Sequence, residues 1–216
     1  CPNTFNPDQA DDDMDGIGNV CDDDFGLSLI WIPVDNGNCA DDTDSDGEDD
    51  VDLSGFDTFD LYARFPGPFA YVALDSAAPE GESTTNAGLS LVSGEFFEHP
   101  LASNTPPNGT LIGLFPCIAF DTFYDDQGAS PFAASAEDPN EFGQTLNIFL
   151  LFLPPFAPST QDPIPELSDG ASYVRLLRVT VAESAQVTGE LGLTIDPDAP
   201  PEGLATILRM VPPLPN

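Results

Sequence analysis

The sequence predicts an all-β fold, a β-sandwich of the jelly-roll or immunoglobulin-like kind. Three observations support this prediction. The 23 prolines and 18 glycines are spread along all 216 residues, so no stretch of a dozen residues keeps an uninterrupted helical period. Apolar segments of strand length recur between clusters of turn-forming residues. Sixteen phenylalanines and one tryptophan supply enough apolar surface for a core.

The first 24 residues form an irregular acidic segment whose oxygen-bearing residues follow a regular spacing. Six of them occupy positions 1, 3, 5, 7, 9 and 12 of an EF-hand-type loop: Asp11, Asp13, Asp15, Ile17 through its carbonyl, Asn19 and Asp22. Gly16 stands at position 6, where the loop must turn sharply. Ca²⁺ needs six or more oxygen ligands and would relieve the repulsion among these carboxylates. We therefore predict a calcium site here.

The flanks of this loop add a family resemblance. The segment is similar to a thrombospondin type 3 repeat, which it matches at Cys1, Pro2, Asn3, Asn6, Pro7, Asp8, Gln9, Asp11, Asp13, Asp15, Gly16, Gly18, Asn19, Cys21 and Asp22. The resemblance implies the same calcium ligands and a Cys1–Cys21 disulfide. Asn19 stands where the family more often has Asp, which removes one negative charge and should weaken the site. Only one full repeat is present, so a long calcium-laden array is excluded.

The next element is the apolar segment FGLSLIWIPV at residues 25–34, which has the length of a strand. Both of its sides are apolar, so we expect it to be central in a sheet or sandwiched. It can pair within its own chain, or it can complete the sheet of a neighbouring subunit by β-augmentation.

A second acidic loop follows at residues 41–53 and repeats the calcium-loop spacing. Gly47 again stands at position 6, and the candidate ligands at positions 1, 3, 5, 7 and 9 are Asp42, Asp44, Asp46, Glu48 and Asp50. Position 12 is Leu53, which cannot close the site, although Asp49 or Asp52 could substitute in an irregular loop. The loop resembles the dockerin type but lacks the amphipathic helix that follows in that family. The alternative is a solvated acidic loop without an ion.

The rest of the chain predicts a series of short strands. We expect them at residues 58–65, 69–74, 89–97, 110–115, 117–123, 146–153, 172–182, 185–194 and 205–211. Glu183 and Ser184 separate two of these strands and predict a hairpin between them. The chain therefore divides into the calcium-binding segment 1–24 and a β-sandwich domain spanning 25–216.

The charge of the chain excludes several kinds of partner. Thirty-eight acidic residues face four arginines and no lysine, which gives a net charge of −34. Nucleic-acid binding is excluded because phosphate contacts are made chiefly by Lys and Arg, and adhesion to anionic membranes is disfavoured. The longest apolar run, residues 146–156, contains Pro154 and Pro155 and is too short to span a bilayer, so we expect no membrane insertion.

The four cysteines are Cys1, Cys21, Cys39 and Cys117, and they permit three pairings. The thrombospondin resemblance implies the first pair, which would leave Cys39 and Cys117 for each other. Oxidised cysteines together with calcium loops indicate an extracellular or cell-surface protein.

Catalytic residues are sparse, and we expect that the protein is not an enzyme. His99 is the single histidine, and it precedes a proline in a turn where a hydrogen-bonded or surface role is usual. No G-x-S-x-G nucleophile motif occurs. The pair Glu95 and Glu98 fits a solvated strand edge better than a glycosidase site.

These observations leave three functional interpretations. The first is a calcium-stabilised structural or adhesive protein, a self-assembling filament or sheath subunit that contacts copies of itself or other cell-surface proteins. The second is a carbohydrate-binding module that would use Trp31, Tyr62, Tyr71, Tyr124 and Tyr173 to contact glycans. The third is a non-catalytic fragment of a secreted enzyme.

Overall fold

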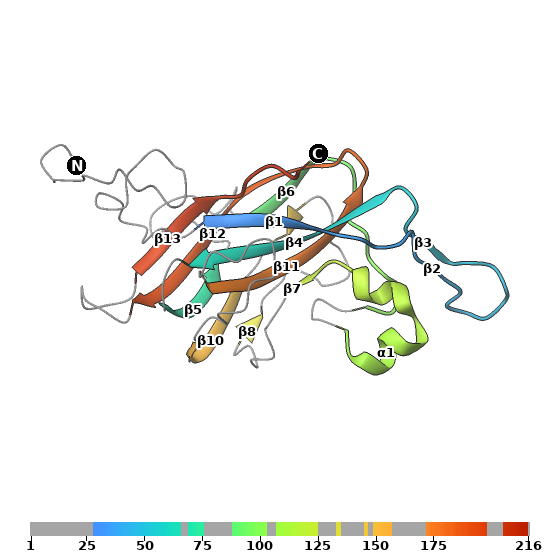
Figure 1. Cartoon of the computed structure of the whole chain (residues 1–216), viewed down its shortest axis with the longest axis horizontal. Coiled ribbons are helices and arrows are strands. Elements are labelled where there is room, and N and C mark those ends of the chain that lie inside the picture. Colours follow the sequence, from blue (N-terminus) through green and yellow to red (C-terminus); the bar gives the residue numbers. More distant parts are fainter. Residues whose placement is uncertain are drawn as a thin grey trace, which may run out of the picture.

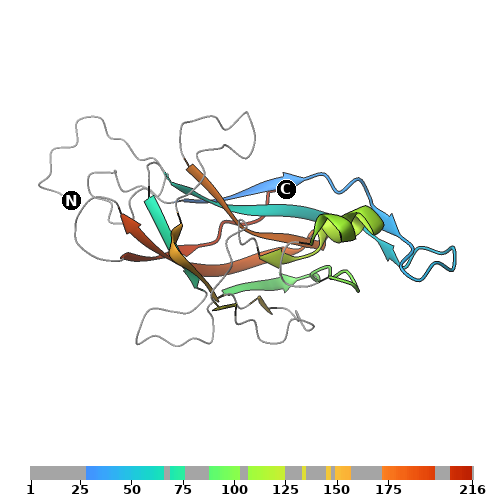
Figure 2. The same ribbon diagram turned by 90° about the horizontal axis from the view of Figure 1, so that it is seen from below.

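The computed structural model describes residues 28–65, 69–75, 88–102, 107–124, 133–134, 145–146, 149–156, 172–197 and 205–215. Within these ranges the chain consists mainly of antiparallel strands, with one short α-helix and one 3-10 helix. The prediction of an all-β fold is confirmed. The segment 1–24 lies outside the described residues. The strands form the body of the molecule, and one small hairpin projects from its end (Figures 1 and 2).

The first sheet has the strand order β1-β4-β11-β7. Its strands are β1 (Ser28–Val34), β4 (Phe56–Phe65), β11 (Ser172–Ala182) and β7 (Phe123–Tyr124). β1 pairs with β4 along its whole length, from Ser28 opposite Arg64 to Val34 opposite Thr58. The predicted strand 25–34 therefore pairs within its own chain, but it ends the strand order instead of lying at its centre. An exposed proline, Pro33, is tolerated at such an edge.

The second sheet has the order β8-β10-β5-β12-β6-β9, and β13 also pairs with β12. Its strands are β8 (Ala133–Ala134), β10 (Phe149–Phe156), β5 (Phe69–Asp75), β12 (Gln186–Pro197), β6 (Gly88–Ser93), β9 (Thr145–Leu146) and β13 (Ala205–Met210). β12 pairs with three other strands. Its first half, residues 186–190, pairs with β6, and its second half, residues 192–197, pairs with β5. β13 pairs with residues 190–195 of β12.

Within the described residues, two short crossings of the chain connect the sheets. A tight turn after β11 leads into β12, with the Ala185 amide donating to the Ala182 carbonyl at 2.9 Å. The prediction of a hairpin was wrong in its pairing, because β11 pairs with β4 and β7 while β12 belongs to the second sheet. The second crossing is at Gly94 (φ 91°), after which residues 95–97 leave β6 and pair with the end of β11. A Cβ at Gly94 would lie 2.8 Å from the Ala185 Cβ, so the two crossings pack directly together.

Two predicted strands are helical. The segment predicted as strand 110–115 forms helix α1 (Gly109–Leu114), and Asn108 caps it by accepting from the Thr110 and Leu111 amides at 3.0 Å. The segment predicted as strand 117–123 is mostly the 3-10 helix η2 (Pro116–Phe120), followed by the short strand β7. Pro116 at the start of η2 has a fixed φ suited to a helical turn. In these two segments the Asn108 cap and Pro116 favour helical turns, although the apolar pattern is typical of strands.

Buried side chains lie on both faces of the first sheet. One face carries Phe59, Leu61, Val179 and Val181, and the other carries Thr58, Asp60 and Thr180. The polar face is covered by the segment 116–122, where the Thr180 hydroxyl donates to the Phe120 carbonyl and the Thr122 hydroxyl accepts from the Thr180 amide at 3.2 Å. In the described part of the chain, no helix has the length and apolar character needed to cross a bilayer.

Candidate metal centre

The second acidic loop is carried by a small hairpin. Its strands β2 (Ala40–Asp41) and β3 (Val51–Asp52) pair antiparallel, and the Asp50 amide donates to the Asp41 carbonyl at 2.9 Å. Figures 1 and 2 show this hairpin projecting from the same end of the molecule as α1. The loop between the strands is therefore accessible to ions and to other molecules.

Three of the five predicted ligands in this loop converge. Carboxylate oxygens of Asp42, Asp44 and Asp50, at positions 1, 3 and 9, all lie within 4.8 Å of one another. Asp46 and Glu48 do not belong to this group, and the Asp46 carboxylate instead accepts from the Glu48 amide at 2.9 Å. The alternating aspartates thus do bring oxygens together, but over a smaller set of residues than the spacing predicted.

Backbone amides hold the three carboxylates in place. Asp42 accepts from the Ser45 amide at 2.6 Å and from the Gly47 amide at 2.9 Å. Asp50 accepts from the Thr43 hydroxyl at 2.6 Å and the Thr43 amide at 2.9 Å, and these bonds lower its pKa. Gly47 has φ 92°, a backbone conformation that side-chain-bearing residues rarely adopt. The loop is therefore shaped around ionised oxygens by its own backbone.

The closing ligand of an EF-hand loop is absent here. Leu53, at position 12, is fully buried in an apolar cluster with Val51 and Cys117. Asp52, a possible substitute, instead accepts from the Ser54 amide at 2.8 Å and the Ser54 hydroxyl at 2.9 Å, which lowers its pKa. An ion held by the three converging carboxylates would therefore need further oxygens from the backbone, from water or from another molecule.

The base of the hairpin is fixed to the body by a disulfide and a buried carboxylate. Cys39 and Cys117 are bonded, with their Cα atoms 5.5 Å apart, so the pairing that the resemblance left for these two cysteines is present. Asp41 is only 6% exposed and accepts from the Cys117 amide at 2.8 Å. Because both sulfurs are oxidised, the group formed by these cysteines and Asp41 is not a thiolate metal site.

His99 lies directly behind this carboxylate. Its Nδ1 accepts from the Leu101 amide at 3.2 Å, so the ring proton of the neutral imidazole is on Nε2, 3.5 Å from the Asp41 carboxylate. Among the described residues Nε2 has no hydrogen-bond partner. Burial lowers the pKa of His99, an effect that the Asp41 charge opposes. The expectation that this histidine has a hydrogen-bonded role is met by Nδ1, but the residue is buried and not on the surface.

Asp121 binds the backbone of His99. Its Oδ1 accepts from the His99 amide at 2.7 Å, and burial raises the pKa of its carboxyl to about 7. No sequence pattern indicated a cluster of Asp41, His99 and Asp121, because they are far apart in the chain and come together only at the disulfide.

No family model, no curated protein and no solved structure matches this chain.

The other predicted site residues have separate outcomes. The six N-terminal calcium ligands and the Cys1–Cys21 bridge lie outside the described residues. Of the aromatic residues considered for glycan binding, Trp31 and Tyr173 are buried, and the Trp31 indole N–H donates to the Pro212 carbonyl at 2.8 Å. These two rings are therefore not available for stacking on a sugar.

Proposed function

We propose that this protein is a secreted, calcium-stabilised structural or adhesive protein, whose loop 42–50 binds Ca²⁺. The observation that carries the proposal is the convergence of the Asp42, Asp44 and Asp50 oxygens within 4.8 Å in a loop shaped by its own amides. Hard oxygen ligands of this kind suit Ca²⁺ better than softer metals. Binding would neutralise three close negative charges.

The setting supports an extracellular location. The Cys39–Cys117 disulfide fits an oxidising compartment, as in secreted proteins. Extracellular calcium modules commonly bind with dissociation constants of about 0.1–1 mM, which a site with three carboxylates and no bidentate closing ligand can reach. Such a site is occupied outside the cell and largely empty in a cytosol with submicromolar calcium.

The incomplete coordination of the loop supports an adhesive role. Because Leu53 cannot close the site, an oxygen from a partner molecule can complete the shell of the ion. The hairpin projects from the body, which places the loop where a partner can reach it (Figure 1). Copies of a chain with a charge of −34 repel one another, and a bridging divalent cation removes part of that repulsion where they touch.

We further infer that the two sheets pack face to face as a β-sandwich. The tight turn between β11 and β12 and the crossing at Gly94 both connect one sheet to the other over a few residues. The apolar face of the first sheet, with Leu61, Val179 and Val181 fully buried, requires an apolar layer against it.

Calcium titration of matched variants tests the proposed site. Asp44→Asn removes a charge from the converging group, whereas Asp35→Asn changes an exposed aspartate in a separate turn. Native mass spectrometry at millimolar calcium should show one ion fewer on the Asp44 variant and an unchanged count on the control. The number of bound calcium ions must be compared, and not merely whether calcium is bound, because the N-terminal segment is predicted to bind calcium as well. Equal counts on both variants would exclude loop 42–50 as the site.

A further inference from the structure

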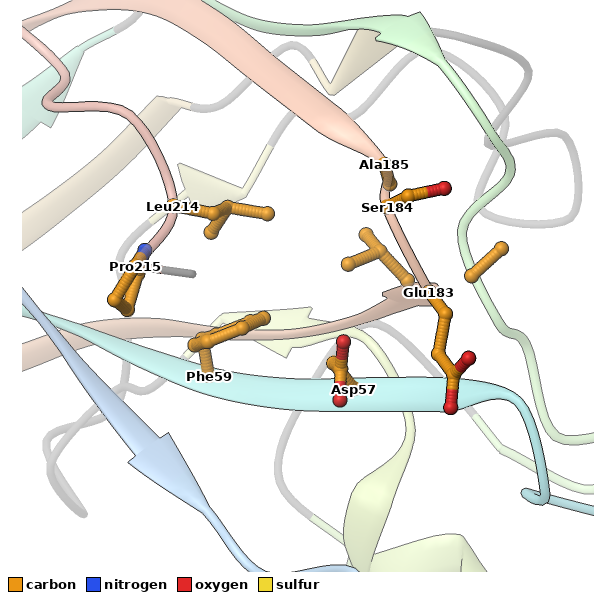
Figure 3. Close-up of a pocket in the computed structure, with 9 residues that line it drawn as sticks. Asp57, Phe59, Glu183, Ser184, Ala185, Leu214 and Pro215 are labelled. Atoms are coloured by element: carbon orange, nitrogen blue, oxygen red, sulfur yellow. The ribbon is translucent and has the colours of Figure 1, made fainter.

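A pocket lies at the end of the first sheet where β4 begins, and its residues are distinct from those of loop 42–50. It has a volume of about 480 Å³ and is enclosed by β4, the turn between β11 and β12, and the C-terminal residues Leu214 and Pro215. Figure 3 shows the carboxylates of Asp57 and Glu183 on one side of the pocket and Phe59, Leu214 and Pro215 on the other. The pocket is thus divided into a negatively charged part and an apolar part.

The apolar wall is held in place by buried contacts. Phe59 is 6% exposed, and its ring makes an edge contact with Trp31, with the centroids 6.4 Å apart. The Trp31 N–H donates to the Pro212 carbonyl and so fixes the tail that brings Leu214 to the pocket. The wall is therefore preformed, and binding there would require little ordering of the chain.

The charged side has no cation within the described residues. No ion pair of Asp57 or Glu183 occurs among these residues, and Arg175 and Arg178 both bind Asp60 on the opposite face of β4. Asp57 and Glu183 are both exposed, and they come together because Asp57 is paired with Val181, two residues before Glu183. Two carboxylates beside an aromatic ring and aliphatic side chains match a cation at the end of an apolar stem.

We propose that this pocket binds a primary ammonium group carried on an aliphatic chain, such as the side chain of a lysine in a partner protein. The stem would lie against Phe59 and Leu214, and the ammonium would donate to Asp57 and Glu183. The chain itself contains no lysine, so the group comes from another molecule. This site is independent of the proposed calcium loop and goes beyond the calcium-dependent role.

Small probes separate the charged and apolar contributions. N-acetyl-lysine methylamide carries the ammonium and the stem, whereas N-acetyl-norleucine methylamide carries a stem without charge. Titration of each into the calcium-loaded protein at 0.15 M salt, followed by backbone amide NMR, should give saturable shifts at residues 57–59 and 183–185 for the lysine compound. We expect a dissociation constant on the order of millimolar and at least fivefold weaker binding of the norleucine compound. Equal binding of both compounds would overturn the proposal.

Variants identify the residues involved. Asp57→Asn with Glu183→Gln should weaken lysine-compound binding at least fivefold, and Leu214→Ala should weaken it without changing the charge. The control Asp35→Asn should bind as the parent does. All three changed residues lie at or near the surface, and thermal unfolding checks that each variant is folded. Unchanged affinity in the double variant, or shifts spread over the acidic surface instead of the pocket, would contradict the proposal.

The source of the ammonium is tested with cadaverine, a free diamine with a similar stem. Tighter binding of cadaverine than of the lysine compound assigns the pocket to free amines, and the reverse assigns it to a peptide side chain. Either order supports an ammonium site, whereas no saturable binding of either compound would overturn it.

Discussion

The carboxylate of Asp60 is buried on β4 and is neutralised by two arginines of β11. Arg178 forms a two-point contact, in which its Nε lies 2.7 Å from Oδ1 of Asp60 and its Nη2 lies 2.8 Å from Oδ2. Arg175 adds one hydrogen bond to Oδ2 at 3.2 Å. Both guanidinium groups also lie over the ring of Phe123, at 5.6 and 5.9 Å from its centroid. A buried charge of this kind is tolerated only while its partners are present.

Arg178→Met should therefore destabilise the protein by about 3–5 kcal/mol, because it leaves the Asp60 charge buried without its main partner. Arg175→Met is the matched control. The Arg175 side chain is 26% exposed and contributes one long bond, so we expect a clearly smaller loss. Urea unfolding at fixed calcium measures both variants. Equal losses would show that the two-point contact of Arg178 has no special weight.

The titration of Asp121 makes the free energy of unfolding depend on pH. Its pKa in the folded protein is about 7, above the unfolded value of about 3.9. Between these values the native state holds a proton that the unfolded state has released, so this residue's contribution to stability falls as the pH rises from about 4 to about 7.

Asp121→Asn should remove this dependence. Relative to the parent, the variant should gain stability as the pH rises through this window, apart from a constant difference due to the altered hydrogen bonds. The comparison cancels the effect of the other acidic residues, which both proteins share. Urea unfolding at pH 4.5, 6 and 8 provides the measurement, and parallel pH profiles would contradict the raised pKa.

At the scale of elements, the β2–β3 hairpin depends on its anchor. The Cys39–Cys117 disulfide closes a loop of 78 residues, and the Asp41 carboxylate binds the Cys117 amide. The residues just before Asp42 therefore attach the acidic loop to the body.

Replacing both cysteines with alanine should cost up to about 4.5 kcal/mol, the loop-closure value for this separation. We also expect weaker calcium binding by loop 42–50, because the hairpin then loses the fixed base at which Asp41 pairs with Val51 and the Asp50 amide donates to the Asp41 carbonyl. Chemical denaturation and a calcium titration measure the two effects separately. Unchanged calcium affinity would mean that the loop's own amide bonds suffice to shape it.

The crossing at Gly94 gives a second prediction for an element. Gly94→Ala adds a methyl group that would meet the Ala185 Cβ at 2.8 Å, at a residue with φ 91°. Gly55→Ala is the matched control, since Gly55 has φ 89° and nothing within 4 Å. We expect the first variant to lose about 1–3 kcal/mol more than the second, as measured by urea unfolding. Equal losses would show that backbone strain alone decides the cost.

At the scale of the whole molecule, the net charge of −34 opposes both compactness and association. The basic residues of the described chain lie on strands, while the acidic hairpin projects into solvent. We therefore expect that divalent ions bound at the periphery would affect contacts between molecules more than the strand-built body.

Assembly should accordingly depend on calcium. In 1 mM Ca²⁺ we expect light scattering to show particles larger than a single chain, and chelation should return them to single chains while circular dichroism of the β-body stays unchanged. Mg²⁺ at the same ionic strength is the control, because its smaller octahedral shell suits this loop poorly. Identical scattering in calcium, magnesium and chelator would contradict the proposed assembly.

Local chemistry made much of this predictable from the sequence. The density of proline and glycine together with short apolar runs predicted an all-β fold, and the alternating aspartates with Gly47 predicted where oxygens would gather. Asp42, Asp44 and Asp50 follow from that spacing because a loop of this length returns on itself whatever body carries it. Segment 110–115 was misassigned because its apolar pattern suits a strand, while the Asn108 cap that decides for a helix lies outside the pattern.

What the sequence by itself determined is the class of fold and the position of the acidic loop, because both depend on neighbours within about a dozen residues. Only the tertiary structure decided which strands pair, that Glu183 and Ser184 connect two sheets and not one hairpin, and that Asp41, His99 and Asp121 meet behind the disulfide. The pocket lined by Asp57, Glu183 and Leu214 was likewise decided only by the tertiary structure. These arrangements depend on contacts between residues far apart in the chain, which no local pattern encodes.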